Sequence, residues 1–158
     1  NPKIKDGAYN HEVKKLSPLV TERLKIIKPG QNIWQTKLPK RLQLNVKGAK
    51  LSQIYKRIDP NKPSYTITGS GGGGTHGYHY KEARALTNRE RARLQTFKDN
   101  FEFIGKSETI RRQLGMAVSP DMAKIIFRSV FKTFEKVNYS SIPANILDSK
   151  QTNTFFDK

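Results

Sequence analysis

The stretch LTNRERARLQTF, residues 86–97, carries the strongest local signal in the chain. Thr87 and Glu90 have the spacing of a capping box, in which the Thr hydroxyl accepts from the N–H of Glu90 and the carboxylate accepts from the N–H of Thr87. Both contacts satisfy groups at the start of a helix that would otherwise lack a partner. The stretch therefore predicts a short helix over residues 88–97.

Other segments also carry helix signals. Residues 17–18 and 119–120 are both Ser-Pro, which supplies an N-cap followed by a proline in the first turn. The first of these helices is expected to end at residues 28–30, Lys-Pro-Gly, and a further short helix is expected over residues 107–115. The helix that begins after residue 119 is predicted to be the longest, with apolar residues at four-residue spacing: Ile126, Val130 and Phe134.

The middle of the chain favours extended structure. Residues 54–58 and 64–68 are predicted to be short strands, separated by the turn sequence DPNKP at residues 59–63. The glycine-rich run GSGGGG, residues 69–74, follows directly. The sequence thus indicates an α+β chain with a β-rich, basic N-terminal half and a helical C-terminal segment.

Composition points to a polyanionic partner. The chain has 30 Lys and Arg against 13 Asp and Glu, a formal net charge of +17, which is typical of a protein that binds phosphate-rich nucleic acid. No apolar run reaches the roughly 20 residues of a membrane span, so we expect an intracellular protein without a membrane partner. There is no cysteine, which excludes disulfides and thiol nucleophiles from this chain.

The glycine run has several readings. Residues 69–74 satisfy G-x-G-x-x-G, but no helix signal follows, so a dinucleotide-binding fingerprint is excluded. A P-loop is excluded too, because residues 75–76 are Thr-His where Lys-Ser or Lys-Thr is required. With only His11 besides His76 and His79, no metal site is predicted. Two readings stay open on composition alone: a flexible linker, or backbone that approaches a nucleic acid closely.

Two long motifs decide between these readings. Residues 83–97, ARALTNRERARLQTF, resemble the ninth conserved motif of DNA (cytosine-5) methyltransferases, and residues 112–120, RQLGMAVSP, resemble the tenth. Residues 52–57, residues 62–67 and the glycine run are similar to the target-recognition region of the same family. The resemblance covers roughly residues 16–135, in the family's order, and corresponds to the C-terminal part of such an enzyme.

The resemblance implies a divided fold. A small β-rich target-recognition domain is expected over residues 1–105, and a helical segment over residues 106–136 is expected to dock on an α/β, Rossmann-like catalytic domain that this chain does not contain. Residues 137–158 are expected to form a loosely attached tail. The motifs for the cofactor loop, the Pro-Cys nucleophile and the catalytic Glu are absent.

The resemblance also implies the chemistry. Such enzymes add a Cys thiolate to a flipped-out cytosine, which then takes a methyl group from S-adenosylmethionine. Since this chain has no cysteine, no catalytic residue is assigned to it. The hypothesis is that it acts in the prokaryotic cytoplasm, near the nucleoid, as the recognition subunit or fragment of a methyltransferase, as in restriction–modification. A partner with the Pro-Cys motif would complete it. The alternative is a catalytically inert, stand-alone, sequence-specific DNA-binding protein.

The family's pattern suggests which residues meet double-stranded DNA. Thr66 would fix the DNA backbone beside the flipped nucleotide, residues 68–79 would form a recognition loop in the major groove, and residues 55–57 would lie near a second loop. The ninth motif is expected to be structural, with Leu94 and Phe97 packed beneath the loops. The predicted DNA-binding set is Tyr55, Lys56, Arg57, Thr66, Thr68, Ser70, Gly71, Gly72, Gly73, Gly74, Thr75, His76 and Tyr78.

The tenth motif implies a cofactor contact. Met116, Ala117 and Val118 would line the S-adenosylmethionine pocket beside the missing half. Met116 stands where the family commonly has Asn, and a thioether can fill space there but cannot replace the amide's hydrogen bonds. Arg84, Arg89 and Glu90 of the ninth motif are expected to form internal ion pairs. No metal is expected.

Overall fold

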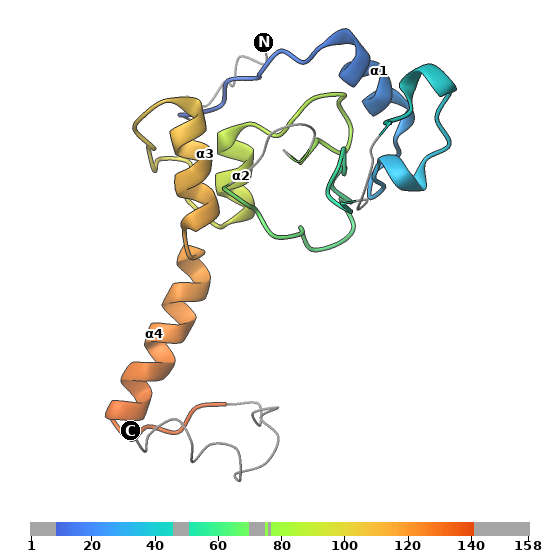
Figure 1. Ribbon diagram of the computed structural model, residues 1–158. Helices are drawn as coiled ribbons and strands as arrows, with labels where there is room; N and C mark the ends of the chain where they lie inside the picture. Colours follow the sequence, from blue (N-terminus) through green and yellow to red (C-terminus); the bar gives the residue numbers. More distant parts are fainter. Residues whose placement is uncertain (1–8, 46–50, 70–74, 76, 141–158) are drawn as a thin grey trace, which may run out of the picture. The chain divides into compact units, whose positions relative to one another are not determined.

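The computed structural model describes residues 9–45, 51–69, 75 and 77–140. It has two compact units, Asn1–Ala123 and Lys124–Lys158. No helix in the described part is long and apolar enough to cross a lipid bilayer. The elements, in chain order, are α1 (Pro18–Ile26), the short 3-10 turns η1 (Ile33–Gln35) and η2 (Lys40–Leu42), α2 (Asn88–Leu94), α3 (Ser107–Met116) and α4 (Pro120–Phe134) (Figure 1).

All four predicted helices are confirmed. The capping box of α2 is present, since the N–H of Glu90 donates to Thr87 Oγ1 at 3.1 Å and the N–H of Thr87 donates to Glu90 Oε2 at 2.9 Å. In α1, Ser17 Oγ accepts from the N–H of Val20 at 3.4 Å, and Pro18 occupies the first turn. Local capping chemistry was therefore sufficient to locate α1 and α2.

Helix α2 ends earlier than predicted, and a residue that follows it contacts the start of α4. Helix α2 ends at Leu94, and Thr96 adopts a positive φ of 61°, which is unusual for a β-branched residue and strained by about 1–3 kcal/mol. Its hydroxyl accepts from the N–H of Asp121 at 3.1 Å and lies 2.8 Å from Ser119 Oγ. Thr96 thus caps the first turn of α4.

The predicted strands at residues 54–58 and 64–68 are wrong for the described part of the chain, which contains isolated bridges in place of regular strands. Tyr55 has a positive φ of 50°, which breaks the extended run that its neighbours favour. Tyr78 instead bridges both Arg57 and Ala85. The α+β class, with its docked catalytic domain, stays a prediction.

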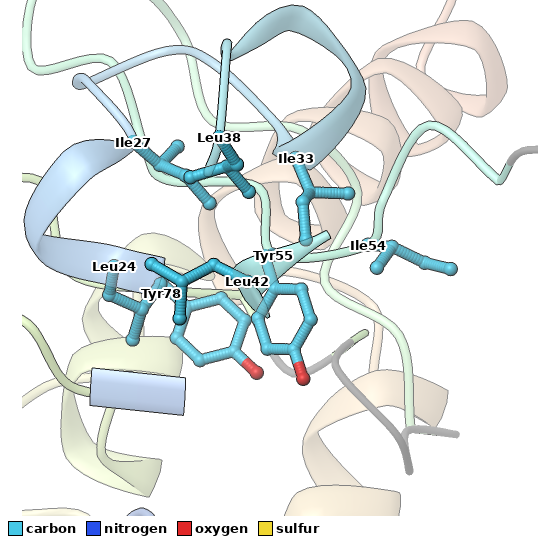
Figure 2. Packing of buried hydrophobic residues seen from close by; sticks show 8 residues of the cluster. All are labelled: Leu24, Ile27, Ile33, Leu38, Leu42, Ile54, Tyr55 and Tyr78. Atoms are coloured by element: carbon cyan, nitrogen blue, oxygen red, sulfur yellow. The ribbon is translucent and has the colours of Figure 1, made fainter. Parts of the chain in front are cut away.

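The first core holds the N-terminal segments around two tyrosines (Figure 2). The rings of Tyr55 and Tyr78 lie 5.5 Å apart between their centroids, and Arg23 Nη1 donates to the Tyr55 hydroxyl at 3.3 Å. This packing buries side chains from α1, η1, η2 and the bridged segments. Its members are Leu24, Ile27, Ile33, Leu38, Leu42, Ile54, Tyr55 and Tyr78.

The second core lies between α2 and α3, which run side by side (Figure 1). Phe97 packs against it, with its ring centroid 5.1 Å from that of Phe103, and its predicted place beneath the recognition loops stays a prediction. Leu94, in contrast, is 39% exposed, so its predicted packing is wrong. The buried members of this core are Ala92, Phe103, Ile110 and Leu114.

The charged residues of the ninth motif divide into two roles. Arg84 and Glu90 form the predicted internal ion pair, with two contacts of 2.7 Å. Arg89 forms no ion pair within the described part of the chain. It is fully buried, and its guanidinium donates to three backbone carbonyls, those of Tyr9, Lys98 and Phe101. Arg89 therefore ties the loop after α2 to the N-terminal segment.

A histidine contacts the capping box of α2, and we expect this contact to make the stability of the protein depend on pH. His11 Nδ1 lies 2.6 Å from Thr87 Oγ1, which also accepts from the N–H of Glu90. Burial lowers the pKa of His11 below 6.5, while Glu90 opposes and Arg93 adds to that shift. The stabilisation is thus complete above pH 6.5 and is lost as the pH falls through 6.5 toward the lowered folded pKa.

We expect the Tm to fall between about pH 7.5 and about pH 5.5, and the fall to be smaller in His11→Gln, whose side-chain carbonyl accepts from Thr87 without titrating. Thermal melts followed by circular dichroism across this range measure the effect. The pH dependence that remains is expected to come from His79, whose pKa burial also lowers. Equal pH dependence in His11→Gln and the wild type would rule out this role for His11.

Candidate nucleic-acid interface

The glycine segment, defined as residues 65–78, is anchored at both ends. At its start, the Tyr65 hydroxyl donates to the carbonyl of Lys56 at 3.2 Å, and the Lys56 ammonium lies 4.9 Å from the Tyr65 ring centroid. At its end, the N–H of Tyr78 donates to the same carbonyl at 3.1 Å. Gly77 is required beside these contacts, because it has φ +72° and a Cβ would lie 2.7 Å from the Tyr65 hydroxyl.

The segment also rests on α3. A Cβ on Gly69 would lie 2.9 Å from the carbonyl oxygen of Arg112, and a Cβ on Gly115 would overlap the backbone of Thr68 and Gly69. Two glycines far apart in sequence therefore let two backbones meet. This contact joins the glycine segment to the tenth motif, and sequence reasoning missed it, since a single Gly near the end of a helix gives no indication of its neighbour.

A cavity of about 240 Å³ lies beside the described part of the glycine segment. It gathers three of the predicted hydroxyls, those of Thr66, Thr68 and Thr75, with Arg91 of α2. No sequence signal separated Arg91 from the other arginines around it. The complete lining is Leu51, Ser52, Gln53, Tyr65, Thr66, Ile67, Thr68, Thr75, Gly77 and Arg91.

The cavity is electrostatically suited to hydrogen-bond acceptors. Burial lowers the pKa of Arg91, and Arg111 adds to the shift, yet a guanidinium remains protonated at neutral pH. Burial raises the pKa of Tyr65, so its phenol stays neutral. Since no carboxylate belongs to the lining of this cavity, its field favours the oxygen and nitrogen acceptors of nucleic acids.

Three residues of the predicted DNA-binding set are buried in the structure. Tyr55 and Tyr78 are 6% and 2% exposed and belong to the first core. Arg57 is 6% exposed, and its guanidinium donates to five backbone carbonyls. Those carbonyls belong to Leu24, Ile27, His79, Tyr80 and Glu82.

The remaining DNA-binding predictions are of two kinds. Thr66, Thr68 and Thr75 line the cavity, and the Lys56 ammonium lies over the ring of Tyr65, another lining residue. The predicted contacts of Ser70, Gly71, Gly72, Gly73, Gly74 and His76 lie outside the described residues.

His79, at the edge of the segment, has a structural environment. Its Nδ1 accepts from the N–H groups of Lys81 and Glu82 at 3.2 and 3.0 Å, and its ring stacks on Tyr80 with centroids 4.7 Å apart. Nowhere in the described ranges do three or more His, Asp or Glu side chains come together as metal ligands would.

The residues of the tenth motif project apolar side chains at the end of α3. Met116 is 79% and Val118 is 62% exposed, while Ala117 is half-buried. Helix α4 is also apolar and exposed, with no buried residue. Its large exposed apolar residues are Met122, Ile125, Ile126, Phe127, Val130, Phe131 and Phe134.

Comparison with known proteins supplies the family. Residues 2–132 match the model of the C-5 cytosine-specific DNA methylases. The chain is 59% identical over 139 residues to the type II methyltransferase M.BbvI of Brevibacillus brevis, a match that covers 88% of the chain and 37% of the relative. It is 46% identical over 139 residues to M.NgoFVII of Neisseria gonorrhoeae, covering 85% and 36%.

A third relative is shorter. The type II methyltransferase M.AquIB of a Picosynechococcus strain is 34% identical over 133 residues, which cover 77% of this chain and 86% of the relative. The chain spans about a third of the length of the first two relatives. The match over residues 2–132, together with these identities, shows that the chain belongs to the C-5 cytosine-specific DNA methylase family.

Proposed function

We propose that this chain is the target-recognition part of a DNA (cytosine-5) methyltransferase, as a subunit or a fragment, and that the glycine segment presents its backbone and hydroxyls to the major groove. The observation that carries the proposal is the anchoring of this segment on α3, beside a cavity of hydroxyls and a buried arginine. A net charge of +17 supports binding to double-stranded DNA.

The chemistry then requires a second component. The chain contains no cysteine, so it cannot supply the thiolate that attacks the cytosine ring. We propose that a catalytic half with a Pro-Cys motif supplies it and flips the base. The similarity to the short relative M.AquIB supports a separately encoded subunit, while the longer relatives support a fragment.

S-adenosylmethionine would contribute the methyl group when bound. The exposed side chains of Met116 and Val118 fit the apolar part of such a ligand, because neither is covered by its own chain. In this proposal they form one wall of the cofactor pocket, with Ala117, and exclude water from it.

The exposed apolar residues of α4 support docking on the catalytic half. Large apolar side chains along a helix with no buried residue mark an interaction surface in a water-soluble assembly. The alternative function, a stand-alone DNA-binding protein, leaves this helix unexplained. The same proposal includes an α/β, Rossmann-like catalytic partner on which this chain docks. It also places the domain boundaries at residues 105 and 136.

The isolated chain is expected to bind duplex DNA without transferring methyl groups. Because basic side chains displace counterions from phosphates, the logarithm of the affinity should fall linearly with the logarithm of the salt concentration. Lys56→Ala should reduce that slope by about 1 and weaken binding to all sequences alike. Fluorescence anisotropy measures DNA binding, and an assay with labelled S-adenosylmethionine measures methyl transfer. Full methyl transfer by the isolated chain would refute the requirement for a catalytic partner.

A further inference from the structure

We propose that residues 37–43, here called the basic loop, contact the phosphates of double-stranded DNA beside the recognised sequence, through Lys37 and Lys40. The inference rests on the proposed function, in which this chain meets DNA. It adds a phosphate-binding surface that neither the sequence motifs nor the family comparison assigned.

The sequence around the basic loop carries charge of one sign. Residues 23–58 contain seven Lys and three Arg and no Asp or Glu. Arg23 and Arg57 are buried and donate to backbone carbonyls, and Arg41 pairs with Glu22 at 2.5 Å. The lysines of this stretch therefore supply the positive charge that a polyanionic partner can use.

The basic loop is held in shape by hydrogen bonds and by buried side chains. Gln43 Nε2 donates to the carbonyl of Leu38 at 2.9 Å, which closes the loop. The Arg23 guanidinium donates to the carbonyls of Leu42 and Gln43 at 2.8 and 3.3 Å. Leu38 and Leu42 are 7% and 1% exposed, so they anchor the loop in the first core. A loop with so constrained a backbone loses little conformational entropy when it binds a partner.

The two lysines of the basic loop point their charge to solvent. Both Lys37 and Lys40 are exposed, and neither forms an ion pair within the ranges that the structure describes. A lysine ammonium is a compact point charge on a flexible stem, which suits a phosphate oxygen better than the directional pattern of a base edge. These lysines would therefore hold DNA without reading its sequence.

The basic loop neighbours the candidate recognition cavity. Lys37 and Trp34 line a second cavity of about 310 Å³, and the indole N–H of Trp34 donates to the carbonyl of Leu51 at 2.9 Å. Leu51 in turn lines the 240 Å³ cavity. Each DNA strand carries a phosphate about every 3.4 Å, so a duplex bound at the 240 Å³ cavity places further phosphates beside it. This position favours DNA over an acidic protein as the partner of the basic loop.

The test begins with the full chain and a pool of randomised duplexes, from which the preferred DNA sequence is selected. Anisotropy titrations at several salt concentrations then compare the wild type with Lys37→Gln/Lys40→Gln. Each lost phosphate contact lowers the salt slope by about 1, so the double variant should lose about 2. It should weaken binding to all duplexes alike and keep the preference for the selected sequence.

Lys124→Gln/Lys132→Gln on α4 is the matched control. It removes the same charge from two exposed lysines of a helix outside the proposed DNA interface, so its salt slope should change by less than about 1. A duplex trimmed to the selected sequence gives a second comparison. On this duplex the wild type should show the lower slope of Lys37→Gln/Lys40→Gln, because the flanking phosphates are absent.

Melts by circular dichroism establish that each variant is folded. If the double variant does not fold, the single variants Lys37→Gln and Lys40→Gln take its place, and each should lower the slope by about 1. An unchanged slope in folded variants of the basic loop, or an equal fall in the control, overturns the role of the loop. A wild-type chain that binds duplexes but selects no sequence overturns the proposed recognition function, while the slopes still decide whether the loop contacts phosphate.

Discussion

Gly115→Ala is expected to weaken sequence-specific DNA binding while α3 remains intact. Alanine stabilises an exposed helix interior relative to glycine by about 1 kcal/mol, so propensity alone predicts a more stable protein. The structure predicts the opposite, because the added methyl group overlaps the backbone of Thr68 and Gly69. Backbone cannot rotate aside as a long side chain can, so the glycine segment must move away from α3.

We expect the affinity for the preferred duplex to fall roughly tenfold or more, equivalent to about 1.4 kcal/mol, and binding to unrelated duplexes to change little. Competition anisotropy measures both, and helix content is followed by circular dichroism. Gln113→Ala on the same helix is the control, since its side chain is exposed. A Gly115→Ala protein that is more stable than the wild type and equally specific would show that this contact does not form.

Arg57→Ala is expected to unfold the chain or destabilise it by more than about 3 kcal/mol. The change deprives five buried or half-buried carbonyls of their donor, and each acceptor left unpaired costs about 1–3 kcal/mol. Three of these contacts are 2.8 Å or shorter. Urea denaturation followed by Tyr and Trp fluorescence measures the loss.

The neighbouring Lys56→Ala provides the contrast. The Lys56 side chain contacts the Tyr65 ring, and its removal should change the free energy of unfolding by less than about 1 kcal/mol. Of these two adjacent basic residues, Arg57 would then stabilise the fold, and Lys56 would contact a DNA phosphate. Equal stability of Arg57→Ala and Lys56→Ala, with lost DNA affinity in the former, would instead favour the original prediction that Arg57 contacts DNA.

The sequence predicted helices better than extended segments for a physical reason. Capping boxes and Ser-Pro starts are local, and each was found within one residue of its predicted position. Residues 54–58 include Tyr55, which has a positive φ and whose ring packs against that of Tyr78, far away in the sequence. Alternation of side chains cannot reveal such a constraint.

The same distinction applies to the candidate site. The hydroxyls of Thr66, Thr68 and Thr75 were predicted from the family resemblance, and the structure gathers them at one cavity. The burial of Arg57 could not be predicted, because a basic residue in a basic chain gives no sign of burial, and the five carbonyls that hold it come from two distant parts of the sequence. Arg91 was missed because the cavity it lines forms only in the fold.

A domain exchange tests the central claim most directly. In M.BbvI, the 139 residues that match would be replaced by this chain, and methyl transfer from labelled S-adenosylmethionine would be measured on the duplex that the isolated chain selects. We predict cytosine methylation within that sequence, and none from M.BbvI that lacks the exchanged part. A folded, cofactor-binding chimera that transfers no methyl group, or that methylates a sequence other than the one the isolated chain binds, would contradict the assignment of this chain as the recognition part.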